Sequence, residues 1–226
     1  MPDDRGRSEG EGRLRPLHGG RHSLPPDVVA FNQRERLLAA VAAVVAEHGY
    51  NKATIAQIAE AASVSRRTFY ENFEGKEDCF FAAYDALDDY LASLMAEAVE
   101  AQLDWADHVA ATFTALLGFL ASRPELARLY LVEATAVGES MASRRDRTAL
   151  RFISLLEEGR STLGDRAPAE GIEEALVGGA VTLLTRRILA GEGADLDRFA
   201  PAVIEFVLSP YLGVDGAREV VARRPE

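Results

Sequence analysis

Residues 54–73, TIAQIAEAASVSRRTFYENF, contain the starts of two short helices with one tight turn between them. Thr54 is followed three residues later by Gln57, the spacing of a capping box, in which each side chain accepts a hydrogen bond from the other residue's backbone N–H. Ser65 stands where a second helix needs an N-cap. The stretch therefore predicts two helices joined by a short turn.

The apolar residues of this stretch fall on inward faces. On the first helix they are Ile55, Ile58, Ala59 and Ala62; in the turn and the second helix they are Val64, Phe69 and Phe73. A small residue at the helix crossing, a tight turn and buried residues at these offsets describe a helix-turn-helix unit. Its second helix is left with Arg66, Arg67 and Tyr70 facing outward.

The two adjacent arginines need an explanation, because cations in the first turn of a helix oppose the helix dipole. Stability therefore does not account for Arg66 and Arg67. An arginine can bond O6 and N7 of guanine bidentately, which discriminates by about 1–3 kcal/mol against other bases. We interpret the pair as reading DNA in the major groove; the alternative is a solvated polar face.

From Gln33 to Asp85, and above all in ATIAQIAEAASVSRRTFYENFEGKEDCFFAAYD, the chain resembles the TetR family of one-component transcriptional regulators. The resemblance implies that five residues face DNA, namely Thr54, Ser65, Arg66, Arg67 and Tyr70. It also implies that Lys76, at the start of the next helix, meets a phosphate. Ser63 stands at the turn, where many family members carry Gly, and a left-handed conformation there costs roughly 1 kcal/mol.

The rest of the chain is patterned as helices, so the predicted fold class is all-α. A first helix is expected from Asn32, capped with Glu35 and ended by Gly49. The helices expected after the helix-turn-helix are 76–101, 105–121, 124–137, 139–163, 168–190 and 196–211. We divide the chain into an arm (1–26), a helix-turn-helix DNA-binding domain (27–75) and a helical ligand-binding and dimerisation domain (76–226).

The arm is expected to be disordered because its Gly, Arg and Pro offer almost nothing to bury. It contains five arginines: Arg5, Arg7, Arg13, Arg15 and Arg21. Two interpretations remain open, a solvated tail and a basic arm that follows the DNA backbone or enters a minor groove.

Two apolar stripes with small residues between them suit the last two expected helices for dimerisation. The candidates are Leu176, Gly179, Leu183, Val203, Phe206 and Val207. The family resemblance implies a four-helix bundle between two protomers, and a homodimer places two recognition helices about one DNA turn, ~34–36 Å, apart. The alternative is a core face within one protomer.

The middle helices combine aromatic and polar residues, and in the family this region encloses a pocket for a small inducer. The candidate ligand-binding residues are Tyr84, Trp105, His108, Phe113, Tyr130, Glu133 and, beside them, Thr135. Asp104 and His108 lie four residues apart, but without a second pair we expect an ion pair on a helix face there and no metal.

Composition sets the remaining expectations. The 226 residues carry a net charge of −11, nearly all of it after residue 78, while the first third is almost balanced. The single cysteine, Cys79, lies among apolar residues and is expected to be buried. We expect no signal peptide, no membrane partner, no cofactor and a cytoplasmic protein.

The predicted function is a sequence-specific DNA-binding transcriptional regulator. We expect a repressor that a small-molecule inducer of unknown identity releases from a palindromic double-stranded operator. A ligand acts by preferring one of two conformations, typically with a coupling of about 1–3 kcal/mol. The alternatives are a DNA-binding dimer without an inducer, and a helical carrier or enzyme with an incidental helix-turn-helix. No catalytic residue set is apparent, so the chain is not expected to be an enzyme.

Overall fold

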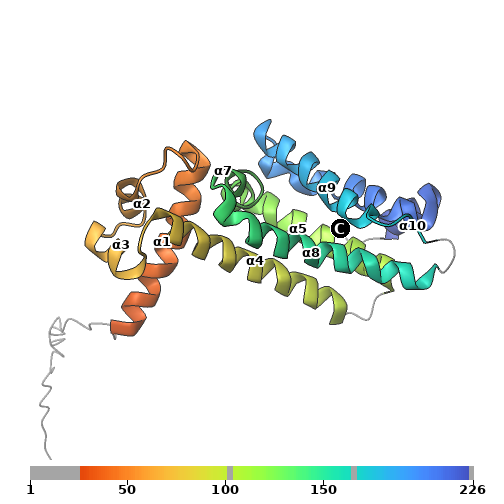
Figure 1. The fold of residues 1–226 in the computed structure, drawn as a ribbon, viewed down its shortest axis with the longest axis horizontal. Coiled ribbons are helices and arrows are strands. Elements are labelled where there is room, and N and C mark those ends of the chain that lie inside the picture. Colours follow the sequence, from red (N-terminus) through yellow and green to blue (C-terminus); the bar gives the residue numbers. More distant parts are fainter. Residues whose placement is uncertain (1–25, 101–103, 164–166, 224–226) are drawn as a thin grey trace, which may run out of the picture.

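The computed structural model describes residues 26–100, 104–163 and 167–223, and all regular structure in these ranges is helical. A small domain at one end of an elongated molecule carries α1 (Pro26–His48), α2 (Ile55–Ala61) and α3 (Arg66–Asn72). A larger helical domain forms the rest, and α4 (Lys76–Glu100) runs from one to the other (Figure 1). The predicted arm lies outside the described residues, except for Pro26.

The helix-turn-helix forms as its sequence predicts. Thr54 and Gln57 make the reciprocal capping box, and Ser65 accepts a bond from the backbone N–H of Thr68. Ile58, Ala59 and Phe69 are buried between α1, α2 and α3. Local hydrogen-bonding patterns thus determine both helix starts, and the apolar spacing determines which faces pack.

The start of α1 was predicted wrongly. The helix begins at Pro26, six residues before Asn32, so Asn32 and Glu35 are not its cap. Proline is favoured in the first turn of a helix, because its missing N–H has no partner there and its fixed φ suits the helix. The predicted end is correct, with Gly49 in the left-handed region at φ 78°.

The turn between α2 and α3 places Ser63 at φ 51°, the one left-handed non-glycine residue in the described ranges. Arg36 of α1 compensates in part, since its guanidinium donates to the carbonyl oxygens of Ala62 and Ser63. Ser63 therefore has a strained backbone conformation. The guanidinium of Arg36, on the neighbouring helix, stabilises the turn in that conformation.

Relieving this strain gives a first prediction. Ser63→Gly is expected to raise the free energy of unfolding by about 0.5–1 kcal/mol, because glycine adopts this φ without a Cβ penalty. Thermal unfolding followed by circular dichroism measures it. Ser63→Ala keeps the Cβ and should show no gain; a gain of the same size in Ser63→Ala would contradict the strain argument.

The larger domain is built mainly from α4, α5 (Trp105–Ser122), α8 (Ala142–Glu157), α9 (Ile172–Leu189) and α10 (Ala200–Arg223). Shorter segments join them: η2 (Glu139–Met141), η3 (Glu158–Thr162) and η5 (Gly193–Phe199). α8 and α9 lie side by side, and α10 packs on α5 and α9 (Figure 1). One hydrophobic core runs through both domains, and Cys79, at the start of α4, is fully buried in it.

Between α5 and α8 the chain forms one helix with a wider turn in the middle. α6 (Pro124–Arg128) continues into the π-helical turn η1 (Leu129–Glu133) and then into α7 (Ala134–Ala136). In a π turn the hydrogen bonds join residues five apart, which is rare and occurs frequently at functional sites. The sequence pattern predicts this helix from Pro124 but not its π turn.

A buried carboxylate joins three segments at the far end of the larger domain. Glu173, in the first turn of α9, is 2% exposed and accepts two bonds from Arg160 of η3, at 2.6 and 2.9 Å. The hydroxyl of Tyr211 of α10 donates to the same carboxylate at 2.7 Å. Burial acts to raise the pKa of Glu173, but these hydrogen bonds outweigh it and hold the pKa below its usual value.

Predicted helix boundaries also differ from the structure in α9 and α10. α9 begins at Ile172, four residues after Pro168, because Gly171 precedes it in the left-handed region. The last helix was predicted to end at Tyr211, but α10 continues to Arg223 beyond a kink at Gly213, whose φ is 72°. Glycine adopts this φ without strain, so the backbone bends at Gly213 and the helix then resumes.

Candidate functional site

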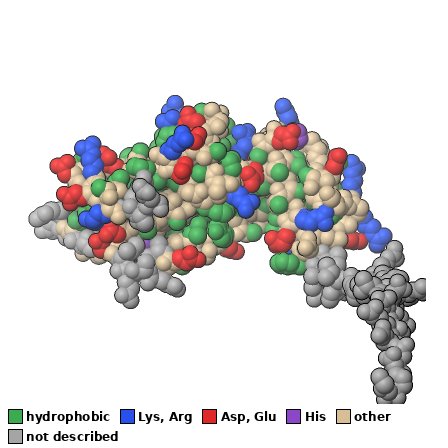
Figure 2. Space-filling model, turned by 180° about the vertical axis from the view of Figure 1, so that it is seen from behind, with side chains coloured by type: hydrophobic (Ala, Val, Ile, Leu, Met, Phe, Trp, Pro, Cys, Tyr) green, Lys and Arg blue, Asp and Glu red, His purple; other side chains and the backbone are tan. Residues whose placement is uncertain are grey.

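The outer face of α3 carries the predicted DNA-reading side chains. Arg66, Arg67 and Tyr70 are exposed, and Tyr70 packs edge-on against the buried ring of Phe69. Arg67 forms an exposed ion pair with Glu71, one turn along α3, at 2.9 Å. An exposed pair of this kind contributes about 0.3–0.5 kcal/mol, so little holds Arg67 back from a base edge. Lys and Arg side chains appear at the free end of the small domain in Figure 2.

Thr54 and Ser65 lie at the starts of α2 and α3 with their hydroxyls already bonded. Thr54 bonds Gln57, and Ser65 bonds Thr68 at 2.9 Å. Their roles in the structure are those of helix caps, and both remain exposed. Their contact with DNA stays a prediction.

Lys76 lies in surroundings that the sequence did not predict. Its ammonium donates to the carbonyl oxygens of Tyr50 at 2.7 Å and Ala53 at 3.0 Å, and it lies 4.3 Å from the centre of the Tyr50 ring. Burial lowers its pKa. Lys76 therefore holds the loop before α2 in place, and a phosphate contact would have to use the donor that remains; that contact is still a prediction.

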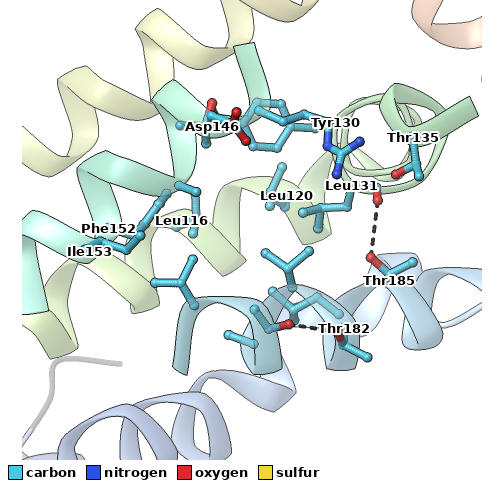
Figure 3. A pocket seen from close by; sticks show the side chains of 18 of the residues that line it. Leu116, Leu120, Tyr130, Leu131, Thr135, Asp146, Phe152, Ile153, Thr182 and Thr185 are labelled. Carbon is cyan, nitrogen blue, oxygen red and sulfur yellow. Dashed lines mark hydrogen bonds between the residues drawn. The ribbon is translucent and has the colours of Figure 1, made fainter. Parts of the chain in front are cut away.

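A pocket of about 530 Å³ lies in the larger domain between α5, η1, α8 and α9. Most of its wall is apolar, including Leu116, Leu120, Leu131, Phe152 and Ile153 (Figure 3). Its volume and lining are those of pockets that bind small molecules. The residue pattern alone contains no direct sign of this space, because amphipathic patterns show which faces are buried and not whether the space between them is filled.

One wall of the pocket is a hydrogen-bonded pair of phenols. Tyr84 and Tyr130 stack with ring centres 4.7 Å apart. The Tyr130 hydroxyl donates to buried Asp88 at 2.7 Å, and the Tyr84 hydroxyl lies 3.2 Å from the Thr148 hydroxyl. Burial raises the pKa of both tyrosines, so both phenols are neutral hydrogen-bonding groups at neutral pH.

Asp88 connects this wall to α8. It accepts bonds from Thr148 at 2.8 Å and from Arg151 at 2.5 Å. One turn earlier, Asp85 receives a two-oxygen contact from Arg144, 3.0 Å to each oxygen. α4, which leads directly to the small domain, is thereby tied to a helix that lines the pocket.

The predicted ligand-binding residues divide into two groups. Tyr84, Phe113, Tyr130 and Thr135 line the pocket, whereas Trp105, His108 and Glu133 do not. The Trp105 indole donates to the backbone of Leu155 at 2.7 Å, and His108 is buried. These three side chains lie outside this pocket and belong to the packing between helices, so their contact with a ligand stays a prediction.

The pocket also uses residues that the sequence analysis missed. They include Arg145, Asp146, Thr148 and Ala149 of α8, and Val177, Thr182, Thr185 and Arg186 of α9. The sequence signal that could have indicated the pocket face of α8 is the apolar stripe of Ala149, Phe152 and Ile153 on a helix rich in charged residues. Arg145 and Arg186 form no ion pair with any described residue, so two cationic groups remain available at the pocket.

The predicted dimerisation residues also divide. Leu176, Val203 and Val207 are buried within the protomer and pack in its own core, so a role for them at an interface stays a prediction. Phe206 is 47% exposed, and its ring covers Gly179, where an added Cβ would come within 3.0 Å of it. Leu183 is partly exposed. The stripes did identify buried faces, but most of each stripe packs on its own chain.

Two further expectations concern metals and membranes. Asp104 caps α5 by accepting from the backbone N–H of Asp107 at 2.9 Å, so the predicted pairing of Asp104 with His108 was wrong. In the described ranges, His, Cys, Asp and Glu side chains nowhere gather in threes as a metal site requires. None of the helices in these ranges has the length and apolar character needed to span a bilayer.

Comparison with known proteins identifies the small domain. Residues 37–83 match the family model of the bacterial regulatory proteins of the tetR family. The HTH-type transcriptional activator FasR of Mycolicibacterium smegmatis is 30% identical over 122 residues, which cover 53% of this chain and 54% of FasR. The match thus spans about half the length of that curated relative.

Solved structures extend the similarity in fold to the larger domain. The fatty acid degradation regulator FadR from Bacillus halodurans superposes with a TM-score of 0.69 at 19% identity, over 81% of this chain and 97% of FadR. FadR from Bacillus subtilis, determined in complex with stearoyl-CoA, superposes with a TM-score of 0.66 at 19% identity, over 79% and 98%. At these identities the comparison shows a shared fold.

Proposed function

We propose that this chain, whose residues 37–83 match the family model of the bacterial regulatory proteins of the tetR family, is a dimeric transcriptional regulator that reads a palindromic operator and responds to a small molecule. The observation that most strongly supports this proposal is the outer face of α3, where Arg66, Arg67 and Tyr70 are exposed on a well-capped helix. Stability does not require two cations there, and guanine recognition uses them well.

Selection of bound sequences from a random duplex pool tests the proposal. At about 150 mM salt, non-specific phosphate binding is suppressed, so enrichment reports base recognition. The expected result is a palindrome whose half-sites contain guanine. Absence of enrichment, repeated after unfolding and refolding to remove any bound ligand, would reject sequence-specific binding and favour the carrier or enzyme alternative.

Substitution of Arg67 tests the assignment residue by residue. Arg67→Ala is expected to reduce discrimination at one base pair by about 1–3 kcal/mol per half-site, since a bidentate contact to guanine is lost. Binding of the selected operator and of its single-base variants measures this. Glu71→Ala removes the partner of Arg67 and leaves the guanidinium, so it should retain discrimination; equal losses in both variants would contradict the assignment.

We propose that the ligand is an elongated apolar molecule with an anionic end. The apolar wall of the 530 Å³ pocket supports the apolar part, and Arg145 and Arg186 support the anionic end. The B. subtilis FadR structure holds stearoyl-CoA, so stearoyl-CoA is the first probe and free coenzyme A is its control. A bound ligand stabilises by RT ln(1 + [L]/Kd), about 2.7 kcal/mol at 100 Kd. Stabilisation by neither probe would reject this ligand class.

We propose repression as the direction of control, with release of the operator by the ligand. FasR is described as an activator, so a reporter gene placed behind the selected operator must decide. Lower reporter output in the presence of the protein supports repression, and higher output would replace it with activation.

The proposed homodimer uses exposed apolar residues of α9 and α10, among them Leu189, Phe206, Leu212 and Val214. Phe206→Glu is expected to convert the dimer to a monomer, because a charge cannot be buried unpaired at an interface. Analytical ultracentrifugation at micromolar concentration measures this, with Leu150→Glu, at an exposed apolar site on α8, as control. A wild-type monomer would reject the dimer.

A further inference from the structure

The π-helical turn η1 touches the pocket on one side and the small domain on the other. Tyr130 and Leu131 line the pocket, and Glu133, two residues later, is buried against the loop that leads to α2. Less than one turn of helix therefore separates a pocket wall from the DNA-binding domain. This junction lies beside α4, which joins the domains through the chain itself.

On the pocket side, α9 holds the π turn by a single hydrogen bond. The Thr185 hydroxyl donates to the carbonyl oxygen of Leu131 at 3.2 Å (Figure 3). Both residues line the pocket. A ligand in the pocket would contact Thr185, Leu131 and the stacked ring of Tyr130 together. Its presence would therefore act directly on the geometry of the π turn.

On the other side, Glu133 binds the backbone of the small domain. One carboxylate oxygen accepts from the N–H of Tyr50 at 2.7 Å, and the other accepts from Arg128 at 3.0 Å. Glu133 is 4% exposed, so this bond is shielded from water. Hydrogen bonds to charged groups contribute about 1.5–3 kcal/mol, more than neutral ones.

Tyr50 is in turn the anchor of the loop that carries the first helix of the reading unit. Its carbonyl accepts from Lys76, whose ammonium also bonds the carbonyl of Ala53, the residue before the Thr54 cap. Its ring packs edge-on against Phe80, with centres 5.1 Å apart. A shift of Glu133 therefore moves the start of α2, and α2 sets the position of α3.

We propose that the π turn transmits ligand occupancy of the pocket to the helix-turn-helix. The path runs through the hydrogen bond from the Tyr50 N–H to Glu133, which makes Glu133 the positioning residue. The inference rests on the proposed function for its biological meaning. A π turn can exchange register with an ordinary helical turn, which would rotate Glu133 relative to Tyr130 and Leu131. Such a discrete alternative is what a two-state switch requires.

Two threonines of the pocket provide a matched pair for the test. Thr185 and Thr182 both line the pocket from α9, but Thr182 donates to Gly178 of its own helix at 2.8 Å (Figure 3). Thr185→Val and Thr182→Val remove one hydroxyl each and keep the shape of the side chain. Amide hydrogen exchange of the full chain, followed at Tyr50, needs neither DNA nor ligand.

The expected result is an exchange rate at Tyr50 at least about fivefold faster in Thr185→Val, the effect of losing roughly 1 kcal/mol of local stability, and unchanged in Thr182→Val. Equal rates in the two variants, or a rise spread evenly over the whole chain, would overturn the proposal. Because this readout involves no DNA, its failure leaves the proposed function standing.

A second variant locates the path. Glu133→Met removes both acceptor oxygens and keeps the length of the side chain, so Thr185→Val should have no further effect on the Tyr50 amide in that background. An undiminished effect would show that the signal bypasses Glu133. On the selected operator, Thr185→Val is expected to change affinity by at least about fivefold, within the range of coupling between sites, and Thr182→Val by less than about twofold.

Discussion

The Arg160→Ala variant is expected to lose about 3 kcal/mol of unfolding free energy at pH 7, because the change leaves the carboxylate of Glu173 buried without its cation. Removing one partner of a buried ion pair costs about 3–5 kcal/mol. Arg160 itself is partly exposed, which places the effect at the lower end. The bond from Tyr211 remains, but one hydroxyl does not replace a bidentate guanidinium. Urea unfolding with the wild type as reference measures the difference.

The loss should depend on pH in a definite direction. In the wild type the pKa of Glu173 lies below its usual value, so the ionised carboxylate adds stability above about pH 4.3 and this contribution is lost as the pH falls further. In Arg160→Ala, burial would be the dominant effect on the Glu173 carboxyl. It would raise the pKa of that group and disfavour its ionised form. The difference between the proteins is therefore largest at neutral pH and shrinks below about pH 4.

A second ion pair provides the control. Arg198 bonds Asp195 at 3.1 Å, but both side chains are exposed, so Arg198→Ala should cost less than about 1 kcal/mol and show little dependence on pH. An Arg160→Ala variant no less stable than Arg198→Ala would mean that Glu173 does not need its partner.

Phe69→Ala is expected to cost about 3–5 kcal/mol and to abolish DNA binding, because it empties the centre of the small domain. The ring is fully buried, with Phe73 5.8 Å and Tyr70 5.6 Å away between ring centres. α2 and α3 are seven residues each, too short to persist without this packing. Denaturant unfolding and operator binding measure the two effects.

Tyr70→Phe is the matched control, since it keeps a ring against Phe69 and removes only an exposed hydroxyl. Its stability should stay within about 0.5 kcal/mol of the wild type. Any loss of DNA binding in Tyr70→Phe would then report a direct contact, whereas the loss in Phe69→Ala reports the missing scaffold. A stable, DNA-binding Phe69→Ala protein would refute the assignment of Phe69 to the core.

The small domain could be predicted closely because its determinants are local. The capping box of Thr54 and Gln57, the left-handed Ser63 and the inward Phe69 all depend on residues within one or two turns. Such short-range patterns leave few alternatives. The start of α1 was missed because a helix can extend past a good cap sequence when the preceding residues tolerate it.

The larger domain was predicted in its helices but not in its contacts. The bond from Tyr50 to Glu133 joins residues 83 positions apart, and no periodicity encodes it. The stripe through Val203 and Val207 correctly indicated burial, but a stripe does not say whether its partner is the same chain or another. Tyr84 and Tyr130 were placed at the pocket because of the family resemblance; the pattern of residues alone would not have distinguished them from Trp105.

The position of Cys79 allows its thiol reactivity to report how often the surrounding core opens. It is the single cysteine of the chain, it is fully buried near Leu37 of α1, and burial raises the pKa of its thiol to about 12. The folded protein should therefore resist thiol reagents almost completely at neutral pH, since only the thiolate reacts. The rate of alkylation then measures how often α1 and α4 separate, without any label having to be introduced.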